Sequence, residues 1–178
     1  MNKKLTISIT AAMLAAMTCV ATMIIKVPTP GTGGHINIGD TIVLISCWML
    51  GNPYGALAAG IGSGIADLLS GYALYSPGTT IIKFTMSFIG YIIYKLFSKT
   101  KIPKSIAFIL SGIVAESIMV AGYFVYEAAF LKYGIVAAVS VPGNIIQGVA
   151  CLILAIILIN AMTQIPYFRS LMQRKIPH

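Results

Sequence analysis

Long apolar runs interrupted by short polar breaks constrain this chain more than any other feature. The first run extends from Leu5 to Ile25 without a charged residue, and it is longer than the apolar core of a secretory signal peptide. We therefore interpret it as a membrane helix. Only 9% of the 178 residues are charged, against roughly 25% in a soluble domain, and the mean hydropathy is +0.92. The sequence predicts an all-α integral membrane protein.

The number and length of the apolar runs predict six helices. A spanning helix needs about 20 residues, so the chain has room for about five to seven spans and for no separate soluble catalytic domain. Breaks such as Gly51, Asn52 and Pro53 separate the runs. We expect six transmembrane helices in a compact bundle and a single membrane domain over 1–178. The expected helices cover about 5–25, 38–51, 54–69, 79–97, 105–128 and 139–163.

The basic residues predict the orientation in the membrane. Twelve residues are Lys or Arg and the net charge is +8. Nine of these twelve gather at the N-terminus, in one middle loop and at the C-terminus: Lys3, Lys4, Lys95, Lys99, Lys101, Lys104, Arg169, Arg174 and Lys175. Such clusters mark cytoplasmic segments and suit anionic lipid headgroups, so we expect both termini inside the cell and the chain in its plasma membrane. Nucleic acid is not an expected partner, because no basic stripe is interleaved with aromatics.

The segment from Pro28 to Asp40 reads PTPGTGGHINIGD. Its two prolines and four glycines in thirteen residues exclude a regular helix. Because apolar runs lie on both sides, this loop belongs at a membrane surface. We interpret it as the lid of a small-molecule site.

All four acidic residues fall in predicted helices, near the outer end or the middle. Ionisable groups are costly in lipid and are usually paired or functional. Asp67 and Lys83 are expected at similar depth, which predicts an ion pair, either purely structural or in contact with a ligand. Asp40 begins a predicted helix, where a carboxylate caps free N–H groups. Asp40 can cap this helix and also line a ligand site.

Glu116 is the most informative single residue, because a carboxylate midway through a span is rarely there for packing. Val120, Tyr123 and Glu127 continue from it at helical spacing, so the stripe should face the bundle interior or an aqueous pocket. Asn144 and Gln147 share another helix face and serve either helix contacts or a ligand. The expected polar cluster, open to the outside, contains Asn37, Asp40, Asp67, Lys83, Glu116, Asn144 and Gln147.

Small residues form a face on the first helix. Ala11, Ala12, Ala15 and Ala16 give two overlapping Ala-x-x-x-Ala registers. Small residues four apart let another helix approach closely in lipid. From the spacing alone, this face either docks a partner protein or packs within the chain.

The sequence lacks the motifs of several enzyme classes. It has no phosphate-binding G-x-x-x-x-G-K-[ST] loop and no G-x-S-x-G elbow. His35 and His178 are far apart, and Cys19, Cys47 and Cys151 lie in apolar runs, so neither a metal site nor a disulfide framework is expected. Binding fits better than catalysis. Two rivals remain: a secondary transporter with Asp67, Lys83 and Glu116 as an ion relay, and a membrane enzyme acting on lipid-linked substrates.

Several motifs in order resemble a known family: GGHINIGD, GIGSGIADLLSGY followed by YSPGTTIIK, VAESIMVAGYFVYE and PGNIIQ. With them, nearly the whole chain resembles the substrate-binding S components of energy-coupling factor (ECF) vitamin transporters, in the riboflavin-transporter-like branch. The resemblance implies a six-helix prokaryotic protein that captures a vitamin or its precursor from outside. It also implies docking, through Ala11, Ala12, Ala15 and Ala16, onto a membrane coupling protein driven by two ATPases, so that ATP is used by partner subunits and this chain needs no cofactor.

The ligand shell implied by the resemblance extends the polar cluster. It comprises His35, Asn37, Asp40, Asp67, Lys83, Glu116, Tyr123, Asn144 and Gln147. Nickel and cobalt S components carry an N-terminal histidine motif, which is absent after Met1, so a metal cargo is not expected. Mixed carboxylates, amides and one lysine suit a small polar heterocycle. Riboflavin, pyridoxine, hydroxymethylpyrimidine and pantothenate all stay open.

Overall fold

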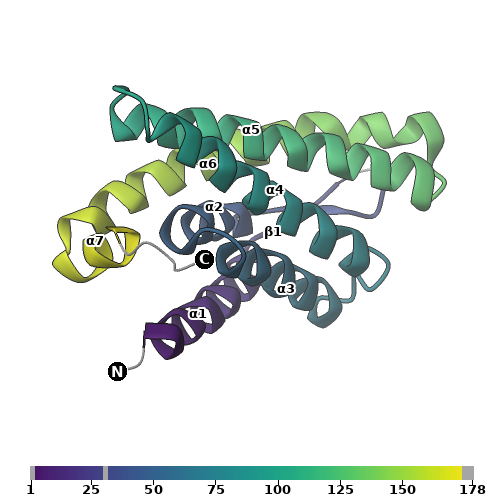
Figure 1. The fold of residues 1–178 in the computed structure, drawn as a ribbon. Coiled ribbons are helices and arrows are strands. Elements are labelled where there is room, and N and C mark those ends of the chain that lie inside the picture. The colour runs from purple at the N-terminus through teal and green to yellow at the C-terminus, as the bar shows by residue number, and fades with distance from the viewer. Residues whose placement is uncertain (1–2, 30–31, 174–178) are drawn as a thin grey trace.

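The computed structural model of the protein describes residues 3–29 and 32–173 and consists almost entirely of helices (Figure 1). The helices are α1 Lys3–Ile24, α2 Gly39–Leu50, α3 Tyr54–Leu69, α4 Ser76–Phe97, α5 Lys104–Val125, α6 Val141–Gln164 and α7 Pro166–Gln173. A π-helical turn η1 (Tyr126–Phe130) and a 3-10 segment η2 (Gly134–Ser140) connect α5 to α6. Two short strands, β1 Lys26–Pro28 and β2 His35–Asn37, lie between α1 and α2.

Within the described residues, four helical stretches are long and apolar enough to cross a membrane: Lys4–Ile24, Ser76–Phe97, Lys104–Phe130 and Gly134–Gln164. The other two predicted spans, α2 and α3, have 12 and 16 residues. At 1.5 Å per residue they are about 18 and 24 Å long, less than the roughly 30 Å of a hydrocarbon core. The helical membrane architecture is confirmed. The count of six crossings and the orientation of the termini stay predictions.

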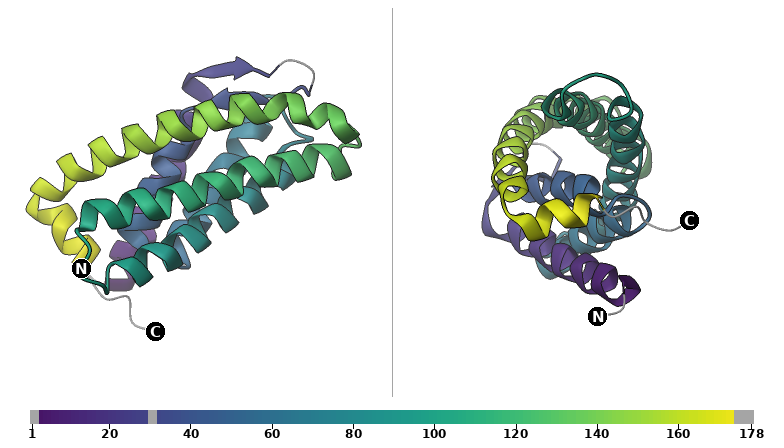
Figure 2. Two further views of the ribbon diagram at one scale, coloured as in Figure 1. Left: turned by 90° about the horizontal axis from the view of Figure 1, so that it is seen from above. Right: turned by 60° about the vertical axis from the view of Figure 1, so that its left-hand side comes forward.

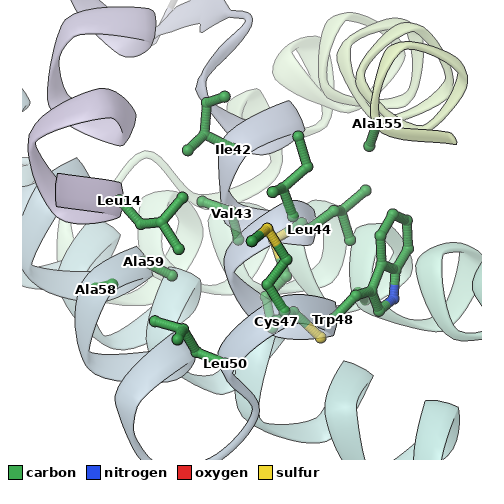
Figure 3. Close-up of a cluster of buried hydrophobic side chains, with 14 of the residues drawn as sticks. Leu14, Ile42, Val43, Leu44, Cys47, Trp48, Leu50, Ala58, Ala59 and Ala155 are labelled. Atoms are coloured by element: carbon green, nitrogen blue, oxygen red, sulfur yellow. The ribbon is translucent and has the colours of Figure 1, made fainter. Parts of the chain in front are cut away.

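Helix α2 is the centre of the bundle. All twelve of its residues are buried, and it contacts every other α-helix among those described. A helix that is apolar all round belongs in an interior rather than at a surface. Figure 3 shows its Val43, Leu44 and Trp48 packed with Leu14 of α1 and Ala155 of α6.

Glycines hold α3 close to its two neighbours. A Cβ atom on Gly62 would lie 2.4 Å from the backbone oxygen of Ala15 in α1, and one on Gly60 would lie 2.7 Å from the backbone oxygen of Thr80 in α4. Real Cβ atoms do not approach so closely, so both positions require glycine. The GIGSG run therefore serves helix contact.

Some elements differ from the expected boundaries. Helix α4 begins at Ser76 rather than Thr79, because Pro77 suits the first turn of a helix. The last expected helix begins at Val141, after the separate segment η2. The loop after α1 contains an unpredicted antiparallel hairpin, in which Lys26 pairs with Asn37 and Pro28 with His35. Helix α7 was also not predicted.

The two ends of the bundle carry different features. At one end lie the start of α1, the loop between α4 and α5, and α7; the hairpin and the α5–α6 connection lie towards the other (Figure 2). The described basic residues of the predicted cytoplasmic clusters, such as Lys101 and Arg169, therefore share one end. Arg174 and Lys175 of the same prediction lie outside the described residues.

Candidate functional site

An ion pair lies at the centre of the polar cluster. The Nζ atom of Lys83 in α4 lies 2.5 Å from Oδ1 of Asp40 in α2, and the two side chains are 2% and 1% exposed. The prediction that Lys83 pairs with Asp67 is therefore wrong. Asp40 is at the buried start of α2, which packs directly against α4, so its carboxylate reaches Lys83.

The same carboxylate connects to α6 and to the hairpin. Gln147 donates from Nε2 to Oδ2 of Asp40 over 2.6 Å, and its Oε1 accepts the backbone N–H of Asn37 over 2.7 Å. The predicted capping role of Asp40 is also wrong, because both of its oxygens have side-chain partners. Asn37, which precedes the N-cap residue Ile38, instead accepts the backbone N–H of Gly39 through its Oδ1 over 2.8 Å. One network thus links β2, α2, α4 and α6.

Asp67 faces the hairpin instead of Lys83. Its Oδ1 lies 3.9 Å from Nε2 of His35, and both side chains are almost completely buried. The imidazole lies against Tyr72, with 4.3 Å between the ring centroids. Burial, with the positive charges of Lys26 and Lys83, lowers the pKa of His35 to about 4. His35 is therefore neutral at pH 7.

A second hydrogen-bonded group ties the hairpin loop to the α5–α6 connection. Ser140 donates to Oε2 of Glu127, and the hydroxyl of Tyr75 lies 3.1 Å from Oε1 of the same carboxylate. Tyr75 also bonds to the backbone oxygen of Thr32 over 2.5 Å. The sequence prediction missed Tyr75 and Ser140 as site residues. Tyr75 lies in the quoted YSPGTTIIK motif, which was the available signal.

The predicted residues surround a small cavity. Its volume is about 20 Å³, and its lining includes five of the nine predicted ligand residues: His35, Asn37, Asp67, Tyr123 and Asn144. The Tyr123 hydroxyl is 3.0 Å from that of Thr79, and its ring centroid is 5.1 Å from Nζ of Lys83. Asp40, Lys83 and Gln147 join this lining through Asn37. Thus eight of the nine predicted residues lie in one connected polar region.

Glu116 is the ninth predicted residue and lies differently. Its side chain is buried, yet neither carboxylate oxygen has a hydrogen-bond partner among the described residues. It lines a separate groove of about 490 Å³ between α5 and α6, beside Gly148. Glu116 is therefore not hydrogen-bonded into the cluster, although its carboxylate interacts electrostatically with Asp40 and Lys83.

The predicted docking face divides into two parts. Ala12 and Ala16 are exposed, whereas Ala11 and Ala15 are partly buried against the bundle. All four line a groove of about 610 Å³ between α1 and α3. Packing within the chain therefore involves Ala15, and an open small-residue face remains at Ala12 and Ala16.

Apolar helices that bury a polar cluster beneath a hairpin, without a nucleotide-binding motif, are typical of a membrane protein that binds a solute. The fold is that of an ECF transporter S component: a solved S component of a bacterial ECF transporter superposes with a TM-score of 0.68, covering 91% of this chain and 98% of that one at 22% identity. Residues 2–164 match the model of the family described as ECF-type riboflavin transporter, S component. The chain belongs to this family, which is one of substrate-binding transporter components and not of enzymes.

A curated relative is similar to this chain over about three quarters of its length. An uncharacterised protein from the gap 3′ region of Pyrococcus woesei is 31% identical over 136 residues, which cover 76% of this chain and 86% of the relative. The family match covers the hairpin, the polar cluster and helices α1 to α6.

Proposed function

We propose that this protein is the high-affinity capture subunit of an ECF-type importer in a prokaryotic plasma membrane. It binds a B vitamin or a related small heterocycle from the extracellular side and delivers it through a separate ATP-driven coupling module. The observation that carries this proposal is the connected polar region beneath the hairpin, built from residues of β2, α2, α3, α4, α5 and α6. Family membership supports it, and riboflavin is the first ligand to test because the family is described by it.

The size of the cavity implies that the hairpin moves during binding. About 20 Å³ accommodates roughly one water molecule, whereas small-molecule sites measure about 300–1,000 Å³. The hairpin is held by the bond from Asn37 to Gln147 and by the bond from Tyr75 to Thr32. These bonds must open, or the hairpin must shift as a unit, to admit a vitamin.

Ligand binding by the purified protein tests the proposal. We expect riboflavin fluorescence to be quenched on titration, or mass spectrometry to find another vitamin co-purifying. Asn144→Ala should weaken binding, because Asn144 is buried and lines the cavity. Asn160→Ala is the matched control, since Asn160 is exposed near the other end of the same helix. Binding of no vitamin, or equal loss in both variants, would contradict this site.

Docking onto the coupling module is the second part of the proposed function. Ala12 and Ala16 give a partner helix close access, and the exposed Leu57 and Ile61 of α3 border the same groove. ATP is hydrolysed by the partner subunits, and this chain holds no cofactor. Ala15 is an unsuitable test position, because its backbone contacts Gly62 directly.

Ala16→Trp tests docking with less disturbance of the fold. We expect this variant to lose co-purification with the coupling protein while keeping its vitamin affinity. The control is Ala150→Trp, an exposed alanine of α6 outside this groove. Loss of docking in both variants would contradict a specific α1–α3 interface.

The sequence also left a stand-alone secondary transporter open. That function requires vitamin uptake by the chain alone, driven by an ion gradient. In proteoliposomes, we expect uptake only when the coupling module and ATP are supplied. Gradient-driven uptake without them would overturn the proposal.

A further inference from the structure

A polar pocket opens at the end of the bundle opposite the hairpin. Its volume is about 230 Å³, and α4, α5, α6 and α7 all contribute residues to its wall. The start of α5, the end of α6 and α7 lie together at this end (Figure 2). The lining includes six polar or charged residues: Lys104, Ser105, Asn160, Thr163, Gln164 and Arg169. This pocket is therefore separate from the proposed vitamin site.

The charge of the pocket is positive and is not balanced by the described part of the chain. Lys104 and Arg169 are its two charged lining residues. Among the described residues, neither of them forms an ion pair with a carboxylate. None of the four acidic residues of the chain lines the pocket: Asp40, Asp67, Glu116 and Glu127. The pocket therefore attracts an anion.

The donors of the pocket suit a phosphate group. Arg169 donates from Nε to the backbone oxygen of Thr163 over 3.0 Å, which holds the guanidinium at the wall. The N–H groups on its two terminal nitrogens can then donate to another acceptor. Asn160 and Ser105 add an amide and a hydroxyl to the lining. Arginine and lysine are the side chains that most often bind phosphate oxygens, arginine through two parallel bonds.

The pocket lies at the depth of lipid headgroups. Lys104 is the first residue of the apolar stretch Lys104–Phe130, and Gln164 is the last residue of Gly134–Gln164. Spanning helices end where the hydrocarbon core meets the headgroups. Tyr94 and Phe108 stack beside the basic residues with 5.0 Å between their ring centroids. An apolar wall next to two cations fits an amphipathic anion better than a fully soluble one.

We propose that this pocket binds the phosphate of an anionic phospholipid. Arg169 and Lys104 contact the phosphate oxygens, and the Tyr94–Phe108 pair lies beside the glycerol and the first acyl carbons. A headgroup of net negative charge, such as phosphatidylglycerol, is favoured over phosphatidylcholine, whose ammonium group would meet two cations. The bound lipid connects α7 to the ends of α5 and α6. This inference goes beyond vitamin capture, because it uses no residue of the polar region beneath the hairpin.

Lipid titration of the purified full chain tests the preference. The delipidated protein in detergent is titrated with phosphatidylglycerol or phosphatidylcholine of the same acyl chains, and native mass spectrometry and thermal unfolding report binding. Phosphatidylglycerol should bind at least about fivefold tighter, raise the unfolding temperature more, and lose its advantage at high salt. Equal binding of the two lipids overturns the proposal.

A soluble phosphate distinguishes a lipid from a free anion. Glycerol 3-phosphate carries the phosphate group without acyl chains, so at the same concentration it should leave the unfolding temperature unchanged. A shift as large as that given by phosphatidylglycerol would identify a soluble anion as the ligand and overturn the assignment to a lipid.

Three variants locate the binding site. Arg169→Gln and Lys104→Gln should each weaken phosphatidylglycerol binding by about fivefold. Lys104→Gln leaves α7 and its bond to Thr163 in place, so its loss of affinity cannot come from unfolding of α7. Lys95→Gln is the matched control, because Lys95 is an exposed cation in the last turn of α4 and does not line the pocket. Its affinity should stay within about twofold. Unchanged affinity in both pocket variants, or an equal loss in Lys95→Gln, would overturn the proposal.

Discussion

Replacing Lys83 with methionine should destabilise the protein strongly. Methionine keeps the length and the apolar stem of the side chain but removes the ammonium group. The Asp40 carboxylate, whose side chain is 1% exposed, would then keep only the bond from Gln147. Removing one partner of a buried ion pair costs about 3–5 kcal/mol, because the remaining charge stays desolvated. The lost contact with the Tyr123 ring adds about 0.5–2 kcal/mol.

Thermal unfolding in detergent measures this effect. For a domain of this size, about 2–4 °C corresponds to 1 kcal/mol, so the two losses together should lower the unfolding temperature of Lys83→Met by roughly 7–28 °C. Circular dichroism and the fluorescence of Trp48, the one tryptophan of the chain, both report the transition. Lys95→Met is the control, because Lys95 lies on the same helix and is exposed; its effect should stay within about 0.5 kcal/mol.

The double variant Asp40→Asn, Lys83→Met separates the lost pair from the lost packing. With no unpaired charge left, it should be clearly more stable than Lys83→Met alone. A single variant as stable as the wild type would refute the assignment. A double variant less stable than either single variant would do the same.

Three further outcomes follow from named contacts. The folded-state pKa of His35 is about 4, below the ordinary value of about 6.5, so the unfolded chain binds more protons between these two pH values. The contribution of His35 to the free energy of unfolding should therefore be full above pH 6.5 and fall as the pH drops towards 4. A His35→Phe variant with the same pH dependence would contradict this assignment. Tyr75→Phe removes the bonds to Thr32 and to Oε1 of Glu127, so it should cost at least about 0.5–1.5 kcal/mol. It should also speed ligand association in stopped-flow experiments, and slower association would count against hairpin movement. Gly62→Val should cost at least about 1–3 kcal/mol in unfolding assays, since its side chain meets the backbone of Ala15; a neutral effect would contradict the α1–α3 contact.

The sequence predicted well which polar residues lie inside the helical bundle. It predicted less well which of these residues contact one another. Apolar runs and costly charges identified the helices, the loop and the polar residues, because both signals depend only on local composition. The partner of Lys83 depends instead on how α2 sits in the bundle. Helix α2 is apolar on every side, so its pattern marks no preferred face, and no local signal shows that Asp40 turns towards α4.

Secondary structure at the ends of the bundle was also harder to predict. The hairpin forms because Lys26 and Asn37 are brought together by the helices on either side, although each strand has three residues. Helix α7 has eight residues, too few to be stable alone, and it packs on α6 and α2. Such elements depend on tertiary contacts that the local sequence does not encode.

The buried carboxylates differ in what a ligand would have to displace. Asp40 and Glu127 each use both oxygens in bonds to side chains of the protein, so a ligand that bonds to either must first break an existing bond. Among the residues that the structure describes, Glu116 has no hydrogen-bond partner, so a ligand that bonds to it would break no bond to these residues. Substitutions should therefore rank in opposite orders in two assays: Asp40→Asn should affect stability more than Glu116→Gln, and Glu116→Gln should affect ligand affinity more than Asp40→Asn. If the same variant had the larger effect in both assays, stability and ligand binding would depend on the same set of residues.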